Sequence, residues 1–112
     1  MDNSPVINIV GSKCRPQDEA RFNKWYDEIH IPMLMKFKGL KAVTRYKLAN
    51  DAKDVPSYFA IFEFGSKADL DAYNKSPELA AAREEMKQSW PEAGCFETVF
   101  RAPYQFLKNV KR

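Results

Sequence analysis

The sequence predicts an α+β fold in which one antiparallel sheet carries all its helices on a single face. Segments rich in β-branched and aromatic residues alternate with segments that repeat apolar residues every three or four positions, and together they read β-α-β-β-α-β. One predicted strand, residues 57–64, is apolar on both sides and therefore needs cover on both faces of the sheet. At 112 residues, the chain is expected to form one domain over residues 1–112.

Four segments have the composition and length of strands. They are residues 6–10, 40–48, 57–64 and 95–106. In the first, the alternation of a strand places Asn8 on the same face as Val6 and Val10. A polar side chain in that place either forms hydrogen bonds within the core or lines a cavity.

The longest helical pattern covers residues 17–40 and contains the only histidine of the chain. Its apolar stripe consists of Phe22, Trp25, Tyr26, Ile29 and Met33. Pro32 disfavours helical geometry at the residue before it, which predicts a break or kink near His30. His30 then lies at the edge of the buried face near a helix end, where the dipole favours the charged ring and burial opposes it.

Two shorter helices are predicted between the third and fourth strands. Ser66 and Ser76 have the residue type and position of N-caps, and Pro77 suits a first helical turn. The second of these helices repeats Leu79, Ala82, Met86 and Trp90 on one side. It is expected to stop at Pro91.

This order of elements is the ferredoxin-like split arrangement. Its helices cover one face of the sheet, so the other apolar face needs a partner. The simplest partner is a second copy of the chain, which predicts a homodimer through sheet faces. The first and last strands are antiparallel neighbours in this topology, so a disulfide between Cys14 and Cys95 is geometrically conceivable, although free thiols are expected in a reducing compartment.

Composition excludes several classes of protein. A net charge of +3 is too small to imply a nucleic-acid or membrane partner, and no apolar run approaches the length of a membrane span. A cytoplasmic location is therefore expected. The single histidine and the two isolated cysteines show no metal-ligand spacing, so no metal and no cofactor are expected.

Two groups of residues resemble known families. Residues 26–32 read Tyr-Asp-Glu-Ile-His-Ile-Pro, precede the Lys-Gly-Leu of residues 38–40, and resemble the helix-to-strand signature of EthD-like proteins. The later half of the chain is similar to the wider dimeric α/β-barrel superfamily, in residues 62–66, 71–73 and 76–78. The resemblance implies two ferredoxin-like subunits whose sheets pack into a barrel, each subunit with a pocket between its sheet and its helices.

The superfamily includes polyketide cyclases, muconolactone-type isomerases, cofactor-free monooxygenases, haem-degrading enzymes and stress-responsive proteins. Cyclase-like members carry a tyrosine and two histidines on the second helical region. Tyr73 matches the tyrosine, but Ser76 and Leu79 occupy the two histidine positions, which argues against that chemistry and against haem. EthD-like members have a histidine on the first helix, and His30 matches it.

His30 is the principal catalytic candidate, as a general base or as a hydrogen-bond donor to a substrate oxygen. The alternative is a histidine that caps helix carbonyls or meets solvent. Tyr73 is the second catalytic candidate, because its hydroxyl can donate a proton to a phenolic or carbonyl oxygen, or orient it. The alternative for Tyr73 is a half-buried helix residue with its hydroxyl in water.

The walls of a substrate pocket are predicted where helix and strand faces converge on one side of the sheet. The predicted pocket residues are Asn8, Phe22, Tyr26, Phe62 and Trp90. Plain core packing is the alternative for each aromatic residue. Arg45 and Arg101 are further candidates to hold a substrate carboxylate, with surface ion pairs as the alternative.

An RNA-recognition module has the same order of elements. Residues 59–64 echo its third-strand motif, but Ser57 and Tyr58 replace the basic-glycine pair, and Ile61 stands where a stacking aromatic is needed. The RNA interpretation is therefore rejected.

These observations favour a cofactor-independent enzyme that performs isomerase, cyclase or monooxygenase-like chemistry on an aromatic, polyketide-like or lactone substrate. The alternative is a non-catalytic EthD-like accessory or stress-responsive protein that binds an apolar metabolite. The sequence leaves open whether the protein is catalytic.

Overall fold

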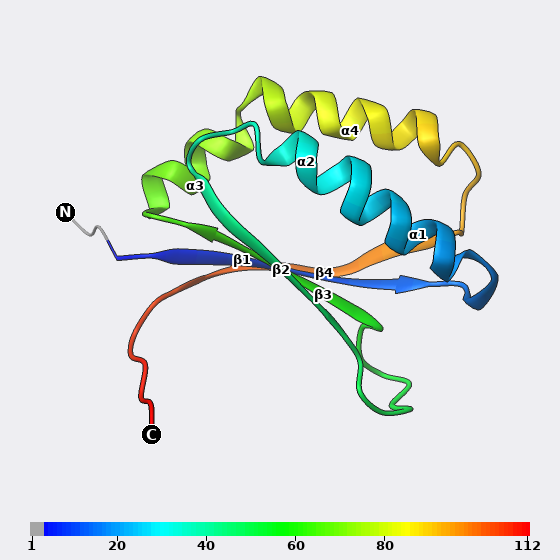
Figure 1. The fold of residues 1–112 in the computed structure, drawn as a ribbon, viewed down its shortest axis with the longest axis horizontal. Coiled ribbons are helices and arrows are strands. Elements are labelled where there is room, and N and C mark those ends of the chain that lie inside the picture. The colour runs from blue at the N-terminus through cyan, green and yellow to red at the C-terminus, as the bar shows by residue number, and fades with distance from the viewer. Residues whose placement is uncertain (1–3) are drawn as a thin grey trace.

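The computed structural model describes residues 4–112 of the chain. In chain order its strands and helices are β1 (Val6–Cys14), a 3-10 turn (Pro16–Asp18), α1 (Glu19–Trp25), a π-helical segment (Tyr26–His30), α2 (Ile31–Leu34), β2 (Leu40–Lys47), β3 (Tyr58–Phe64), α3 (Lys67–Asn74), α4 (Pro77–Ser89) and β4 (Phe96–Gln105) (Figure 1). The predicted order β-α-β-β-α-β is confirmed, with the second helical region divided into α3 and α4.

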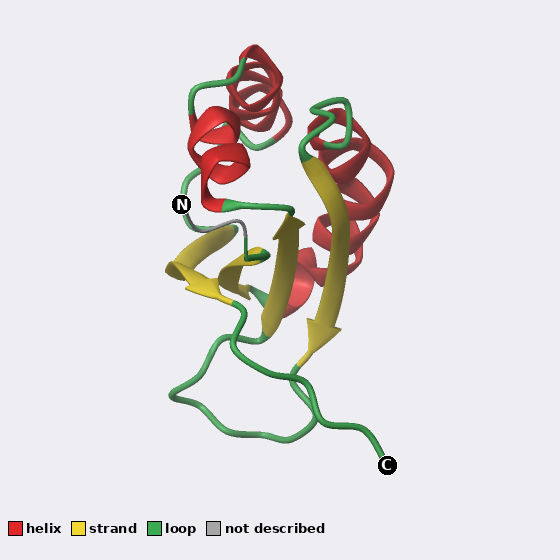
Figure 2. Cartoon of the chain, turned by 90° about the vertical axis from the view of Figure 1, so that its left-hand side faces the viewer, coloured by secondary structure: helices red, strands yellow, loops and turns green. Residues whose placement is uncertain are grey.

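Within the described residues the strands form one four-stranded sheet in the order β2-β3-β1-β4. Every neighbouring pair is antiparallel. The helices all lie on the same side of this sheet, and the opposite face carries none of them (Figures 1 and 2). The predicted ferredoxin-like fold is therefore confirmed.

The core lies between the helices and the covered face of the sheet, with Phe22 at its centre. The side chain of Phe22 is 0% exposed. Its ring contacts the rings of Trp25, Tyr26, Tyr58, Trp90 and Phe96. From β1 the core receives Val6 and Val10, as the predicted alternation requires.

The break predicted near His30 takes the form of a wider helical turn. Ile31 keeps helical dihedral angles, and its N–H donates to the carbonyl of Tyr26, five residues earlier. Pro32 has no N–H, and its ring clashes with the carbonyl four residues before it, so a regular turn is unfavourable there. The backbone accommodates the proline by widening the turn over Tyr26–His30, and the helix continues to Leu34 instead of breaking.

The helices of the second half begin where the sequence predicts. The Ser66 hydroxyl accepts a hydrogen bond from the N–H of Asp69 at 3.2 Å, and the Ser76 hydroxyl accepts one from the N–H of Leu79 at 3.1 Å. Pro77 occupies the first turn of α4. These caps satisfy backbone donors that the first helical turn leaves without a partner.

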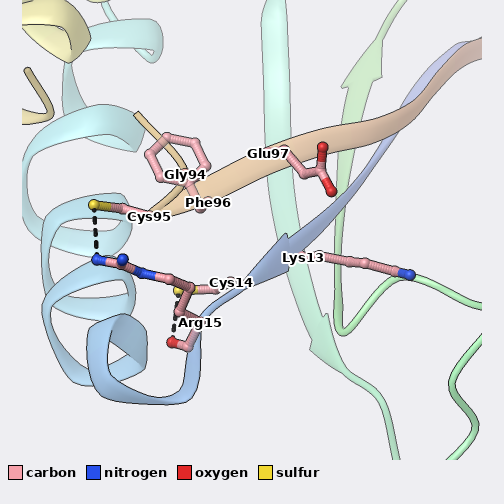
Figure 3. A pocket seen from close by; sticks show the side chains of 7 residues that line it. All are labelled: Lys13, Cys14, Arg15, Gly94, Cys95, Phe96 and Glu97. Carbon is pink, nitrogen blue, oxygen red and sulfur yellow. Dashed lines mark hydrogen bonds between the residues drawn. The ribbon is translucent and has the colours of Figure 1, made fainter. Parts of the chain in front are cut away.

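The junction of β1 and β4 brings the two cysteines to the same end of the sheet (Figure 3). The N–H of Arg15 donates to the carbonyl of Cys95 at 3.0 Å, and its guanidinium donates to the Cys95 sulfur at 3.3 Å. Both cysteines are free thiols in this structure. Burial raises the pKa of Cys14 to about 11, with the carboxylate of Asp18 adding to the shift, so this thiol stays protonated.

The uncovered face of the sheet is apolar, as the sequence predicts. The ring of Phe59 on β3 stacks on that of Phe100 on β4, with 6.3 Å between centroids. Ile7, Ile9 and Ile61 are only half-buried on this face. None of the helices in residues 4–112 is long and apolar enough to cross a membrane.

Replacing the central aromatic residue should measure its contribution to stability. We expect Phe22→Ala to lower the free energy of unfolding by about 3–5 kcal/mol, because a filled site at the centre of the core becomes a cavity. Lys24→Ala, at an exposed position of the same helix, is the matched control and should change it by less than about 0.5 kcal/mol. Urea unfolding of both variants measures the difference in the free energy of unfolding. Similar unfolding midpoints for the two variants would contradict a central role of Phe22 in the core.

Candidate functional site

A small cavity of about 60 Å³ lies between the covered face of the sheet and the helices. It is lined by five of the residues proposed from the sequence, Asn8, Tyr26, His30, Phe62 and Tyr73. They come from β1, the π-helical segment, β3 and α3, so residues distant in sequence meet at one point.

Phe22 and Trp90, also proposed as pocket walls, lie outside the cavity lining. Phe22 is enclosed by the aromatic cluster described above. Trp90 is 8% exposed, and the guanidinium of Arg21 lies 3.8 Å from its ring centroid. Both residues pack the part of the core next to the cavity.

The lining also includes Arg101, a carboxylate candidate from the sequence, and two polar residues that sequence reasoning missed, Asn74 and Arg83. Arg83 could have been found, because it follows Leu79 by four residues and precedes Met86 by three, which places all three on one helix face. Arg45, the other carboxylate candidate, donates to Asp27 at 2.9 Å and to Asn23 at 2.8 Å. Its charge is therefore already paired.

His30 is held between aromatic rings at the edge of the cavity. Its ring stacks on Trp25, with 4.6 Å between centroids, and meets the edge of Tyr26 at 5.0 Å. Its Nδ1 is buried and has no hydrogen-bond partner among the described residues. Burial lowers the pKa of His30 to about 4, with the charge of Arg101 adding to the shift and Glu85 opposing it. The imidazole is therefore neutral near pH 7.

The two tyrosines of the cavity are protonated donors. Burial raises the pKa of Tyr73 to about 12, against the opposing charges of Arg101 and Arg83. Burial also raises the pKa of Tyr26, against Arg45 and Arg101. Neither hydroxyl forms a hydrogen bond to another residue in the part of the chain that the structure describes.

Asn8 adds an amide to this set of unpaired groups. Its side chain is 9% exposed and lines the cavity, without a hydrogen bond to a described residue. In residues 4–112 two side-chain atoms are fully buried without a partner, His30 Nδ1 at the cavity and Trp90 Nε1 outside its lining. A buried polar atom without a partner is costly, so the cavity suits a polar ligand that completes the bonding of His30. Residues 4–112 contain no group of three His, Cys, Asp or Glu side chains that could hold a metal ion.

The depressed pKa of His30 makes a prediction about stability and pH. In the unfolded chain the imidazole takes up a proton below its ordinary value of 6.5, whereas the folded protein resists protonation down to about 4. Acidification through this window favours the unfolded state, so the His30 contribution to stability falls as pH falls. From about pH 7 to about pH 4.5 we expect a loss of about 2 kcal/mol from this residue.

The measurement is the free energy of unfolding at both pH values in the parent protein and in His30→Phe, which keeps a ring against Trp25 but cannot titrate. Both proteins contain the same carboxylates, so the effect of carboxylate titration on stability cancels when the two are compared. An equal acid-induced loss in the two would contradict the assignment of this titration to His30.

Solved structures of similar fold come from proteins of different kinds. The hydroxynitrile lyase of Passiflora edulis superposes with a TM-score of 0.72 at 16% identity, over 98% of this chain and 100% of that chain. An EthD family protein of Bacillus halodurans gives 0.67 at 12% identity, over 91% and 99%. A dimeric protein of unknown function and ferredoxin-like fold from Bacteroides fragilis gives 0.65 at 18% identity, over 91% and 96%. These identities support similarity of fold alone.

The EthD family protein among these structures agrees with the resemblance found in the sequence, at the level of the fold. No curated protein matches the chain in sequence. Residues 6–102, which run from the start of β1 into β4, match the family described as Domain of unknown function (DUF4286), and the chain belongs to that family.

Proposed function

We propose that this protein is a cofactor-independent small-molecule enzyme that moves a proton on its substrate, as an isomerase or cyclase does. The observation that carries the proposal is the meeting of His30, Tyr73 and Asn8 at one buried cavity, each with polar atoms that lack a partner among the described residues. A neutral imidazole beside protonated phenols is the set that enolisation needs. A hydroxynitrile lyase of the same fold supports an enzymatic interpretation.

In the proposed mechanism His30 takes a proton from a carbon next to a carbonyl group of the substrate. The electron pair of the broken C–H bond forms a C=C bond, the π pair of the carbonyl group moves to its oxygen, and Tyr73 donates a hydrogen bond to the resulting enolate. The imidazolium then returns its proton to another position of the substrate, which leaves the enzyme unchanged. The enolate charge stabilises the imidazolium in this poorly solvated site, and this attraction offsets the burial that lowers the pKa of His30 in the free protein.

The size of the cavity limits the substrate. A volume of about 60 Å³ corresponds to about two water molecules, so only the reacting group of a ligand fits inside. The remainder of an aromatic or lactone-like substrate then lies at the mouth of the cavity, beside α3, α4 and β4.

Non-catalytic binding of an apolar metabolite is the second candidate function. The pKa of about 4 favours it, because an imidazole with so low a pKa is a weak base in the free protein. The apolar side chains of Phe62, Leu79 and Met86 in the lining also suit such a ligand. Turnover distinguishes the two functions.

Hydrogen exchange at carbon tests the proposed chemistry directly. In deuterated water, proton NMR follows the loss of the acidic C–H signals of small neutral ketones, lactones and 3-oxobutanamide. We expect His30→Ala and Tyr73→Phe each to slow the catalysed exchange by about 10²-fold or more. Tyr46→Phe removes a hydroxyl from an exposed tyrosine away from the cavity, and should leave the exchange unchanged.

Exchange that is no faster with the protein than without it, across the whole panel, would reject the enzymatic proposal. Binding of the same compounds, seen as shifts in the protein NMR spectrum without exchange, would support the binder.

We also propose that the uncovered face of the sheet pairs with a second copy of the chain. The apolar side chains of this face and the dimeric relative of the same fold support this assembly. Ile61→Asp should convert the dimer to a monomer, because it places a charge at the centre of the apolar face. Ala52→Asp, on the exposed loop between β2 and β3, is the control and should keep the dimer. Light scattering measures the mass, and a parent protein of subunit mass would disprove the assembly.

A further inference from the structure

The charges around the cavity are of one sign. Arg83 from α4 and Arg101 from β4 both line it, and no aspartate or glutamate of the described chain does. Since His30 and the two tyrosines are uncharged near pH 7, the two guanidinium groups give the lining a net positive charge, while the carboxylate of Glu85 acts on His30 from outside the lining.

These two arginines differ from three others in the described part of the chain. Arg15 pairs with Asp18, Arg21 with Glu92, and Arg45 with Asp27, each within 3.1 Å. Arg83 and Arg101 form no ion pair and no hydrogen bond with any residue in the described range 4–112. Both arginines are exposed beside one cavity. Their guanidinium groups are therefore available to an external anion.

The charges of both arginines act electrostatically on the proposed reacting groups. Arg83 and Arg101 both lower the pKa of Tyr73 against the effect of burial, and Arg101 acts in the same direction on Tyr26. Arg101 on β4 pairs with Val10 of β1. Val10 is two residues from Asn8 and lies on the same face of the strand. The anion-binding groups and the unpaired polar groups therefore belong to a single site.

We infer that Arg83 and Arg101 form a carboxylate-binding clamp at the mouth of the cavity, and that the ligand is a short oxo acid whose carbonyl group enters toward Asn8, His30 and Tyr73. This inference rests on the proposed function, whose substrate class it defines. The planar guanidinium groups suit a carboxylate, which accepts hydrogen bonds from two sides. With about 60 Å³ available inside, the acid carries only a few carbon atoms beyond its carboxylate.

A matched pair of ligands tests the clamp. 3-Oxobutanoate and 3-oxobutanamide have nearly the same shape, and only the first is charged. We expect the acid to bind at least about ten-fold more tightly than the amide, from dissociation constants measured by NMR titration. Arg83→Gln and Arg101→Gln should each weaken acid binding by about ten-fold and leave amide binding unchanged.

Arg101→Lys should bind the acid more tightly than Arg101→Gln and less tightly than the parent protein, because lysine keeps the positive charge but lacks the planar guanidinium group. Lys87→Gln removes a cation from an exposed position of the same helix as Arg83, outside the cavity lining, and should have no effect. A substitution that merely disturbed the fold would weaken acid and amide binding alike. Equal affinities of the parent protein for acid and amide would overturn the clamp, as would arginine variants that bind the acid like the parent.

Different experimental results would disprove the carboxylate clamp and the proposed proton transfer. Arginine-dependent binding of the acid without C–H exchange supports the clamp and rejects the enzymatic function. His30-dependent exchange on neutral ketones, with acid and amide bound equally, overturns the clamp and leaves the proton transfer standing.

Discussion

The aromatic packing around Phe22 holds the helices against the sheet next to the cavity. A fully buried phenylalanine surrounded by two tryptophans, two tyrosines and a phenylalanine fills that region to the density of a protein core. The neighbouring region of the sheet carries the smaller side chains of Asn8 and Val10, and both line the cavity. The cavity lies there, next to a well-packed cluster that holds its walls in place.

The wider turn of the first helix is the second determinant of the site. Residues at π-helical turns often serve function, because the turn projects side chains in directions that a regular helix does not use. Tyr26 and His30 stand at the two ends of this turn, and both line the cavity. Pro32, which is exposed and outside the cavity, therefore acts on the site through the backbone.

Local sequence patterns were sufficient to predict the elements and their order. The caps at Ser66 and Ser76 and the alternation in β3 depend on residues close together in the chain, so spacing alone identifies them. Helical spacing identified most of the buried face of the first helix, although Ile29 of the predicted stripe is exposed, and it did not show where along the helix a void remains. Phe22 and Tyr26 share one apolar stripe, yet Phe22 fills the core and Tyr26 lines the cavity, because different strand residues lie opposite them.

Electrostatic roles were harder to predict, since they depend on distant partners. Arg45 and Arg101 were equivalent candidates in the sequence. Only the fold distinguishes them, because it places Asp27 and Asn23 within hydrogen-bond distance of Arg45. Arg83 shares a helix face with Leu79 and Met86, but helical spacing alone does not show that this face lines a cavity. The pKa of His30 required knowledge of its burial, because the helix end and the desolvation act in opposite directions.

The sheet order has a consequence for how this protein avoids aggregation. β2 and β4 are the two edges, and an edge strand exposes backbone groups that can recruit a strand from another molecule. β4 contains Pro103, which offers no N–H to an incoming strand, while β2 carries the exposed cations Lys41 and Lys47. Both edges thus discourage the continuous strand addition that leads to fibrils, and the apolar face remains available for a closed assembly.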